Sequence, residues 1–426
     1  MTRIPDREAQ AKAEMAATQA GPAAARLLVA AFLAVLLSGS ALEWLAPLPF
    51  DAGYRATQLH AHGPAAWLEL AGREGPRAAN RELRALLRRL DRWSEQDLGV
   101  VRRLRRPTQT LLLERLRFGN SQVRAGDGGW LFYEREVDSI TGPPFLHRPA
   151  AERARLGDPE SALRRFGADL RARGIALALV PAPAKSSIEA ARLLGPRAPE
   201  RPLRNPSYYE LARRLEADGI VVFDPTPALF AAARRGELIY LRTDSHWRPE
   251  TVDRVAAAMA EEIFRRGVLP RPRTNPFHRV PRRVVGHPDL VRLLGLPLEG
   301  EGPLYEPLVI QTVRKEKGGL FRPAGAADAP ILLLGDSLAG TYGWGGQELG
   351  SGAGLAEQLA FHLQTPVQAL LEPAGTGIDA RQRLAAALAE NPGALAGKRL
   401  VILEFAEREL AIGPWNPAPL PAATPR

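Results

Sequence analysis

The chain of 426 residues is long enough for one large core or two modest ones, and its 45% hydrophobic and 24% charged residues exclude a disordered chain. Its net charge of +10 comes mainly from arginines scattered through helical segments, which is compatible with nucleic acid but equally with an acidic polysaccharide or an anionic lipid surface. The absence of cysteine excludes disulfides and thiol chemistry and removes the usual soft ligands of a structural zinc.

The N-terminal part of the chain carries an apolar segment that predicts a membrane anchor. Residues 27–42 are mostly Leu, Val, Ala and Phe, and Trp44 follows where an interfacial aromatic residue is expected. A full span needs about 20 residues, so we expect an uncleaved signal anchor over 27–46, after a cytoplasmic leader over 1–26, with the rest of the chain exported. Two alternatives stay open, a cleavage site at Ser38-Gly39-Ser40-Ala41 and a buried core helix.

Residues 47–120 are predicted to form a helical stalk with an arginine-rich polar face. Apolar residues recur there at spacings of three and four, at Leu83, Leu86, Leu87, Leu90 and Trp93. Because Glu and Asp are interspersed with the arginines, a stalk packed on the main domain is favoured over an arm that binds nucleic acid. The glycine-rich turn and aromatic strand at 126–133 then mark the start of the main domain, which we expect to cover 121–412, before a Pro-rich tail at 413–426.

Within the main domain, apolar strands alternate with helices. We expect strands at 175–181, 220–224, 331–335, 367–372 and 400–405, and helices at 208–218, 249–266, 355–363 and 380–389. Continuous apolar strands separated by helices predict a parallel sheet that is covered on both faces. The expected fold class is therefore α/β, a three-layer α/β/α domain with a mostly parallel sheet.

A stretch rich in Pro and Arg, residues 268–330, interrupts this alternation. It contains a predicted short helix at 289–294 and a predicted strand at 308–313. A long insertion between catalytic parts commonly forms a lid or a substrate groove. The alternative is a surface excursion without such a role.

Two short motifs, far apart in the chain, supply the parts of an acyl-transfer triad. Thr243-Asp244-Ser245-His246-Trp247 offers an acid and an imidazole, and Leu334-Gly335-Asp336-Ser337 places a serine at the end of an apolar strand. A serine hydroxyl needs an adjacent imidazole to take its proton and an acid to orient that imidazole. Asp and Ser also cap helices, and a His at a helix start is often only a polar surface residue, so either motif alone is weak. Together they predict a Ser337, His246 and Asp244 triad.

The motifs at 243–247 and 334–337, the strand at 128–132 and the segment Glu404-Phe405-Ala406-Glu407-Arg408-Glu409-Leu410 resemble the SGNH-hydrolase-like polysaccharide O-acetyltransferases of the AlgJ/AlgX type. The resemblance covers about residues 120–412, with the motifs in the family's order. It implies an SGNH-hydrolase-like domain that is circularly permuted relative to the esterases. It also implies a periplasmic enzyme that moves an acetyl group onto hydroxyls of an exopolysaccharide such as alginate.

The same resemblance implies roles for individual residues. Ser337 would carry the acetyl group, His246 would act as general base and then general acid, and Asp244 would orient the imidazole. The Ser337 backbone N–H would contribute to an oxyanion hole, with a second donor from the loop that holds Gly375 and Gly377, although two glycines after a strand can equally be a turn. No cofactor is implied, because a multi-spanning membrane acyltransferase would supply the acetyl group.

Three further residues are candidates for substrate binding. Lys185 follows the first strand and could attract the carboxylate of an acidic sugar, or be an ordinary solvated lysine. Arg408 matches a family position, or pairs with Glu404 or Glu407 to fix the last strand. Tyr342, like Trp344, could stack on a sugar ring or fill the core. The histidines show no metal-ligand spacing apart from the weak His287-Pro288-Asp289, so we expect no metal.

Three functional classes follow from this reading. The first is a polysaccharide O-acetyltransferase, the second a carbohydrate esterase with the same triad, and the third a non-catalytic glycan-binding scaffold of a polysaccharide export complex. The expected location is the bacterial inner membrane, with a single-pass anchor and the catalytic domain in the periplasm. The expected partners are an exopolysaccharide and the membrane acyltransferase, without nucleic acid. The short tail after Leu410 favours the anchored AlgJ type over the AlgX type, which carries a carbohydrate-binding module there.

Overall fold

The computed structural model describes residues 26, 29–30, 99–286, 288–296, 305–343, 349–372 and 375–422. The chain divides into two compact units, 1–110 and 111–426. The predicted anchor at 27–46 lies outside the described residues except for Val29 and Ala30, and so does most of the predicted stalk, of which helix α6 (Gly99–Leu116) is described. Among the helices that are described, none combines the length and the apolar character that crossing a membrane requires.

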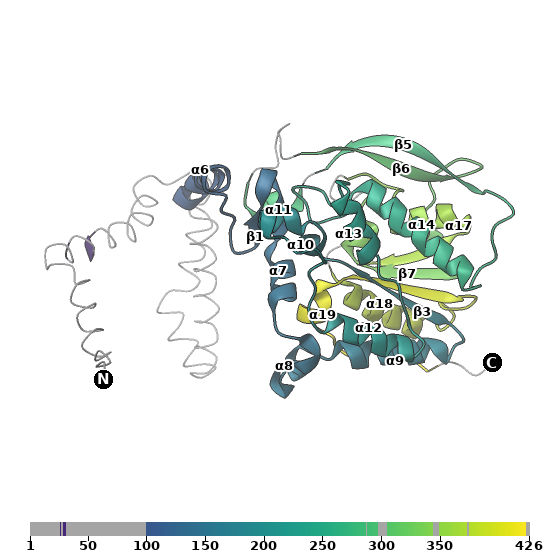
Figure 1. Cartoon of the computed structure of the whole chain (residues 1–426). Helices are drawn as coiled ribbons and strands as arrows, with labels where there is room; N and C mark the ends of the chain where they lie inside the picture. The colour runs from purple at the N-terminus through teal and green to yellow at the C-terminus, as the bar shows by residue number, and fades with distance from the viewer. Residues whose placement is uncertain are drawn as a thin grey trace, which may run out of the picture. The chain divides into compact units, whose positions relative to one another are not determined.

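A five-stranded sheet forms the centre of the second unit, with strand order β4-β3-β9-β7-β8 (Figure 1). Every neighbouring pair in it is parallel. The strands are β3 (Ala176–Ala182), β4 (Val221–Val222), β7 (Ile331–Gly335), β8 (Val367–Leu371) and β9 (Leu400–Ala406). The predicted mostly parallel sheet is thereby confirmed, because each strand falls on one of the expected apolar runs.

Helices cover both faces of this sheet, so the domain has three layers (Figure 1). Ile331 and Leu333 of β7 face a core shared with α14 (Pro249–Arg265) and α17 (Leu355–Leu363). Leu332 and Leu334 face the opposite core, which is shared with α9 (Pro159–Arg171), α12 (Tyr208–Ala217) and α18 (Gly377–Glu390). A strand buried on both faces must be apolar at every position, which explains the unbroken runs in the sequence.

The helices not expected from the sequence include α9, although its start signal is present. Asp158 accepts a hydrogen bond from the backbone N–H of Glu160, and Pro159 occupies the first helical position. Other strands and α-helices of the second unit, outside the insertion, are β1 (Val123–Ala125), β2 (Leu131–Tyr133), α7 (Glu134–Thr141), α8 (Ala150–Leu156), α10 (Lys185–Ile188), α11 (Ala190–Leu194), α13 (Thr226–Arg234), α16 (Ser337–Gly340) and α19 (Arg408–Ile412).

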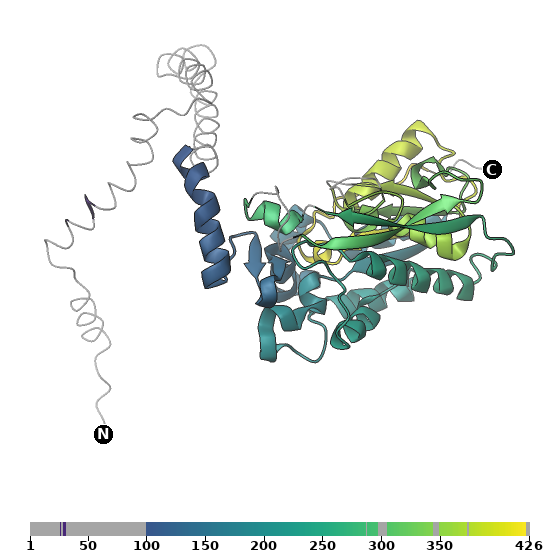
Figure 2. The same cartoon turned by 90° about the horizontal axis from the view of Figure 1, so that it is seen from above.

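The insertion at 268–330 forms a two-stranded antiparallel ribbon of β5 (Phe277–Val285) and β6 (Pro307–Lys315), with helix α15 (Asp289–Leu293) between the strands (Figure 2). The expected helix and the expected strand are both present. Strand β5 was missed because it reads FHRVPRRVV, in which proline and arginine hide the strand pattern. The ribbon packs on α14 and α17 through buried apolar residues of the first core, so it is an integral layer of the domain.

Truncating the central strand should unfold the domain more easily. Leu333 is fully buried in β7, so Leu333→Ala should lower the free energy of unfolding by about 2–5 kcal/mol through lost burial and the cavity left behind. Val309 of β6 is 44% exposed, and Val309→Ala should change it by less than about 0.5 kcal/mol. Chemical denaturation followed by circular dichroism measures both; equal effects would contradict the assigned core.

Candidate active site

The first part of the site is a sharp turn where β7 ends. Ser337 begins helix α16 and is partly exposed, whereas its neighbours in the turn are buried. The Asp336 carboxylate accepts the backbone N–H of Leu338 at 2.8 Å and that of Ala406 at 3.1 Å, which fixes the turn to the adjacent strand β9. A Cβ on Gly335 would lie 2.8 Å from Ala339 Cβ and from Glu404 Oε2, so this position requires glycine.

The second part is the loop that leads into α14. Tyr240 and Trp247 form an antiparallel bridge, and the Leu241 N–H donates to His246 O at 3.1 Å, so the loop between them closes on itself. Inside it, Asp244 Oδ1 accepts the His246 backbone N–H at 2.8 Å and lies 2.7 Å from His246 Nδ1. The other ring nitrogen, Nε2, lies 3.0 Å from Ser337 Oγ. The structure thus brings the three residues predicted from the sequence into one hydrogen-bonded chain.

Burial and neighbouring charges shift the pKa values of His246 and Asp244 in opposite directions. Burial alone would lower the pKa of His246, but the Asp244 carboxylate outweighs it and raises that pKa to about 9. Burial alone would raise the pKa of Asp244, yet its interactions with His246 and two backbone N–H donors hold it below its usual range. The pair is therefore a stable ionic hydrogen bond in which Nδ1 carries the proton that faces Asp244.

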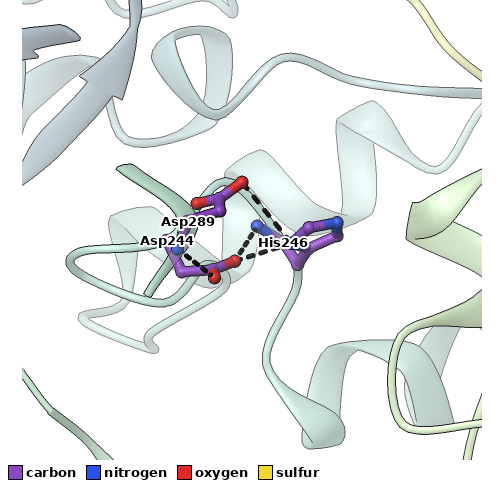
Figure 3. A group of neighbouring side chains, drawn as sticks. All are labelled: Asp244, His246 and Asp289. Atoms are coloured by element: carbon purple, nitrogen blue, oxygen red, sulfur yellow. Dashed lines mark hydrogen bonds and ion pairs between the residues drawn. The ribbon is translucent and has the colours of Figure 1, made fainter. Parts of the chain in front are cut away.

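Asp289, at the start of α15 in the insertion, is a third ionisable residue at this loop (Figure 3). Asp244, His246 and Asp289 have ligand atoms within 4.8 Å of one another, the spacing that a metal ion needs. However, Asp244 Oδ1 and His246 Nδ1 already share a hydrogen bond at 2.7 Å. The expectation that the protein needs no metal stays a prediction. Asp289 was expected at the start of a short helix and in the weak His287-Pro288-Asp289 pattern, and nothing local in the sequence connects it with His246.

Lys185 does not bind substrate at the surface, and both sequence interpretations of it are wrong. It is fully buried, and its ammonium group donates to three carbonyl oxygens, those of Leu131 (2.6 Å), Arg242 (2.9 Å) and Asp244 (3.0 Å). The rings of Trp130 and Phe132 lie about the same ammonium group, at 5.0 Å and 5.2 Å. Lys185 therefore ties the backbone of the Asp244 loop to strand β2.

Tyr342 is buried, and Arg408 is partly buried. Tyr342 is 1% exposed and its hydroxyl donates to Trp247 O at 2.7 Å, so it fills the core behind the His246 loop instead of stacking on a sugar. Arg408 pairs with Glu136 and Glu409, each at 3.3 Å, and not with either of the glutamates expected from the sequence. Trp344 lies outside the described residues.

The two loop glycines have a clear packing role. A Cβ on Gly377 would lie 2.3 Å from Glu404 O, so glycine lets the start of α18 approach strand β9. Gly375 lies after β8, next to the capping box that Thr376 and Asp379 form at the start of α18. Because β8 pairs with β7, this loop leaves the sheet at the same edge as Ser337. A contribution of the loop to an oxyanion hole stays a prediction.

Three comparisons relate the chain to known proteins. Residues 123–407 match the family described as SGNH hydrolase-like domain, acetyltransferase AlgX. The probable alginate O-acetylase AlgJ of Pseudomonas aeruginosa is 30% identical over 191 residues, 45% of this chain and 44% of that protein, so the match spans less than half of that relative. The solved O-acetyltransferase domain of Pseudomonas putida AlgJ aligns with a TM-score of 0.51 and 21% identity over 68% of this chain and 92% of that chain, which indicates a shared fold.

Replacing Lys185 should damage the site as well as the stability. Lys185→Met keeps the apolar stem but removes the donor from three carbonyl oxygens, so it should lower the free energy of unfolding by about 2–4 kcal/mol and slow the reaction of Ser337 with a serine-directed fluorophosphonate. Lys398, also buried, donates to Ala327 O and Ala329 O away from the triad. Lys398→Met should therefore destabilise the fold without slowing Ser337. Equal Ser337 reactivity in both variants would contradict the assigned role of Lys185.

Proposed function

The chain belongs to the SGNH hydrolase-like acetyltransferase family of the AlgJ/AlgX type, and from this membership we propose that it is an O-acetyltransferase that acts on a polysaccharide. The observation that carries the proposal is the hydrogen-bonded chain from Ser337 Oγ to His246 Nε2 and from Nδ1 to Asp244. Ser337 is the partly exposed member of the three, as a nucleophile that meets substrate must be.

Acyl transfer on these residues proceeds in two balanced steps. In the first, Ser337 Oγ attacks the acetyl carbonyl while His246 Nε2 takes the hydroxyl proton, and the departing donor alcohol then receives that proton. In the second, a sugar hydroxyl gives its proton to His246 and attacks the acetyl-serine ester, and Ser337 recovers a proton as it leaves. Asp244 holds the imidazole in the required tautomer throughout both steps.

The acceptor and the cellular setting belong to the same proposal. The relative in Pseudomonas aeruginosa carries the name probable alginate O-acetylase, which supports an exopolysaccharide as acceptor. The apolar segment at 27–46 supports an inner-membrane anchor with the catalytic domain in the periplasm. There a multi-spanning membrane acyltransferase would deliver the acetyl group. Transfer requires that a sugar hydroxyl reach the acetyl-serine ahead of water, and this competition separates a transferase from an esterase.

The assay that tests the function compares transfer with hydrolysis. We expect the full-length protein, incubated with a chromogenic acetyl ester and a panel of uronate and neutral oligosaccharides, to form acetylated sugar that mass spectrometry detects. Ser337→Ala and His246→Ala should each lower that yield by about 10³-fold or more, because the triad residues act as a unit. Serine-dependent ester hydrolysis with no sugar modified would support the esterase instead, and the absence of any Ser337-dependent turnover would support the scaffold.

The pH dependence follows from the raised pKa of His246, about 9. Only the neutral imidazole can accept the serine proton, so the rate of ester cleavage should rise with pH, reach half its maximum near pH 9 and level off above that. Asp244→Asn removes the charge that favours the cation, so its lower residual rate should level off at a more acidic pH. Initial rates between about pH 5 and 10 measure both; a wild-type midpoint near that of free imidazole, about 6.5, would contradict this electrostatic account.

A further inference from the structure

The insertion reaches the His246 loop through Asp289. One Asp289 oxygen, Oδ1, accepts the Ser245 backbone N–H at 2.8 Å, and the other, Oδ2, accepts the Ser245 hydroxyl. The Asp289 backbone N–H donates in turn to Asp244 Oδ2 at 3.0 Å. Asp289 Oδ2 also lies 3.8 Å from His246 Nδ1 (Figure 3). This single residue therefore contacts all three consecutive residues of the loop.

With these contacts, both oxygens of the Asp244 carboxylate are hydrogen-bonded. Its Oδ1 is already bonded to the backbone and ring of His246, and the Asp289 N–H is the donor that the structure gives to Oδ2. Asp289 is the first residue of α15, where a backbone N–H has no partner inside its own helix and is free to donate outward. A carboxylate bonded on both oxygens cannot rotate about its last bond without breaking a hydrogen bond.

Helix α15 is held in place by an apolar cluster of its own. Leu290 and Val291 are fully buried against Val123 and Leu131 of the β1–β2 hairpin. The Asn120 side chain adds a hydrogen bond to Leu293 O at 2.8 Å. These contacts fasten the insertion to the same hairpin that Lys185 ties to the Asp244 loop, so the insertion can hold that loop in place.

We propose that Asp289 is a positioning residue of the acyl-transfer site, which the insertion contributes to keep Asp244 and His246 aligned on Ser337. The inference rests on the proposed function, because alignment matters only if His246 accepts the Ser337 proton. The insertion is then part of the catalytic machinery, and its docking on the hairpin is a condition for a fully active site.

The charge of Asp289 should also affect the pH at which His246 titrates. Burial, followed by the nearby charge of Asp244, raises the pKa of Asp289 to about 6. The charged groups that act on it are Asp244, His246 and the buried pair of Lys185 and Glu136. Near pH 9, where His246 titrates, Asp289 is ionised and adds to the field that favours the imidazolium. Neutralising Asp289 should therefore move the titration of His246 to a more acidic pH.

The test is the pH profile of ester cleavage by full-length Asp289→Asn. Asparagine keeps the backbone N–H and the side-chain shape but removes the charge, so kcat at the plateau of the profile should fall by about 10-fold or more and the midpoint should move down by about half a pH unit or more. Asp253→Asn is the matched control, since Asp253 also pairs with a histidine, His362 at 2.6 Å, but belongs to no part of the triad. It should leave kcat and midpoint unchanged.

A second variant distinguishes a loss of positioning from a loss of folding. Ser245→Ala deletes only the hydroxyl of a partly exposed residue, which donates a hydrogen bond to Asp289. It should lower kcat several-fold and leave the thermal stability at the wild-type value. Wild-type kcat in both variants, or a lower kcat in Asp289→Asn without the acidic shift, would overturn the positioning role. In either case an inactive Ser337→Ala leaves the proposed function standing, whereas a fully active Ser337→Ala would remove the function itself.

Discussion

The whole site depends on one buried ion pair, that of Asp244 and His246. Both side chains are almost fully buried, so each strongly favours the charged form of the other. Their hydrogen bond at 2.7 Å fixes the tautomer of the imidazole and aims Nε2 at Ser337, a residue 91 positions further along the chain. The loop, the sheet edge and the insertion can each be understood as a device that keeps this pair in register with the serine.

Several other ionisable groups are buried around the pair, which is typical of functional sites. Glu404, beneath the nucleophile turn, accepts the Asp336 N–H, and burial followed by the charge of Asp336 raises the pKa of Glu404 well above its usual range. On the other side, Glu136 links Arg408 to the backbone N–H of Lys185, whose ammonium holds the Asp244 loop. Burying these ionisable groups lowers the free energy of unfolding. Their contacts in turn fix the positions of the residues around Ser337 and His246.

The sheet and the triad could be predicted from the sequence because each leaves a local signal. Strands buried on both faces read as unbroken apolar runs such as Ile331–Gly335, and a serine or histidine next to Asp in a turn is visible without a structure. Both interpretations of Lys185, the sugar-stacking alternative for Tyr342 and the expected glutamate partners of Arg408 were wrong, because the actual contacts of Lys185, Tyr342 and Arg408 include distant segments. A lysine after a strand looks the same in the sequence whether water or three carbonyl oxygens surround its ammonium group. Asp289 escaped notice for the same reason, since its contacts with Ser245 span 44 residues.

The most direct test of the account is intact-protein and peptide mass spectrometry of the acyl-enzyme. Full-length protein quenched in acid within seconds of mixing with an acetyl ester should carry the mass of one acetyl group, and peptide mapping should locate it on Ser337. In His246→Ala the adduct should form far more slowly, because nothing then takes the serine proton. Acetyl groups found at other residues only, or an adduct that forms equally fast without His246, would contradict the claim that this hydrogen-bonded chain activates Ser337.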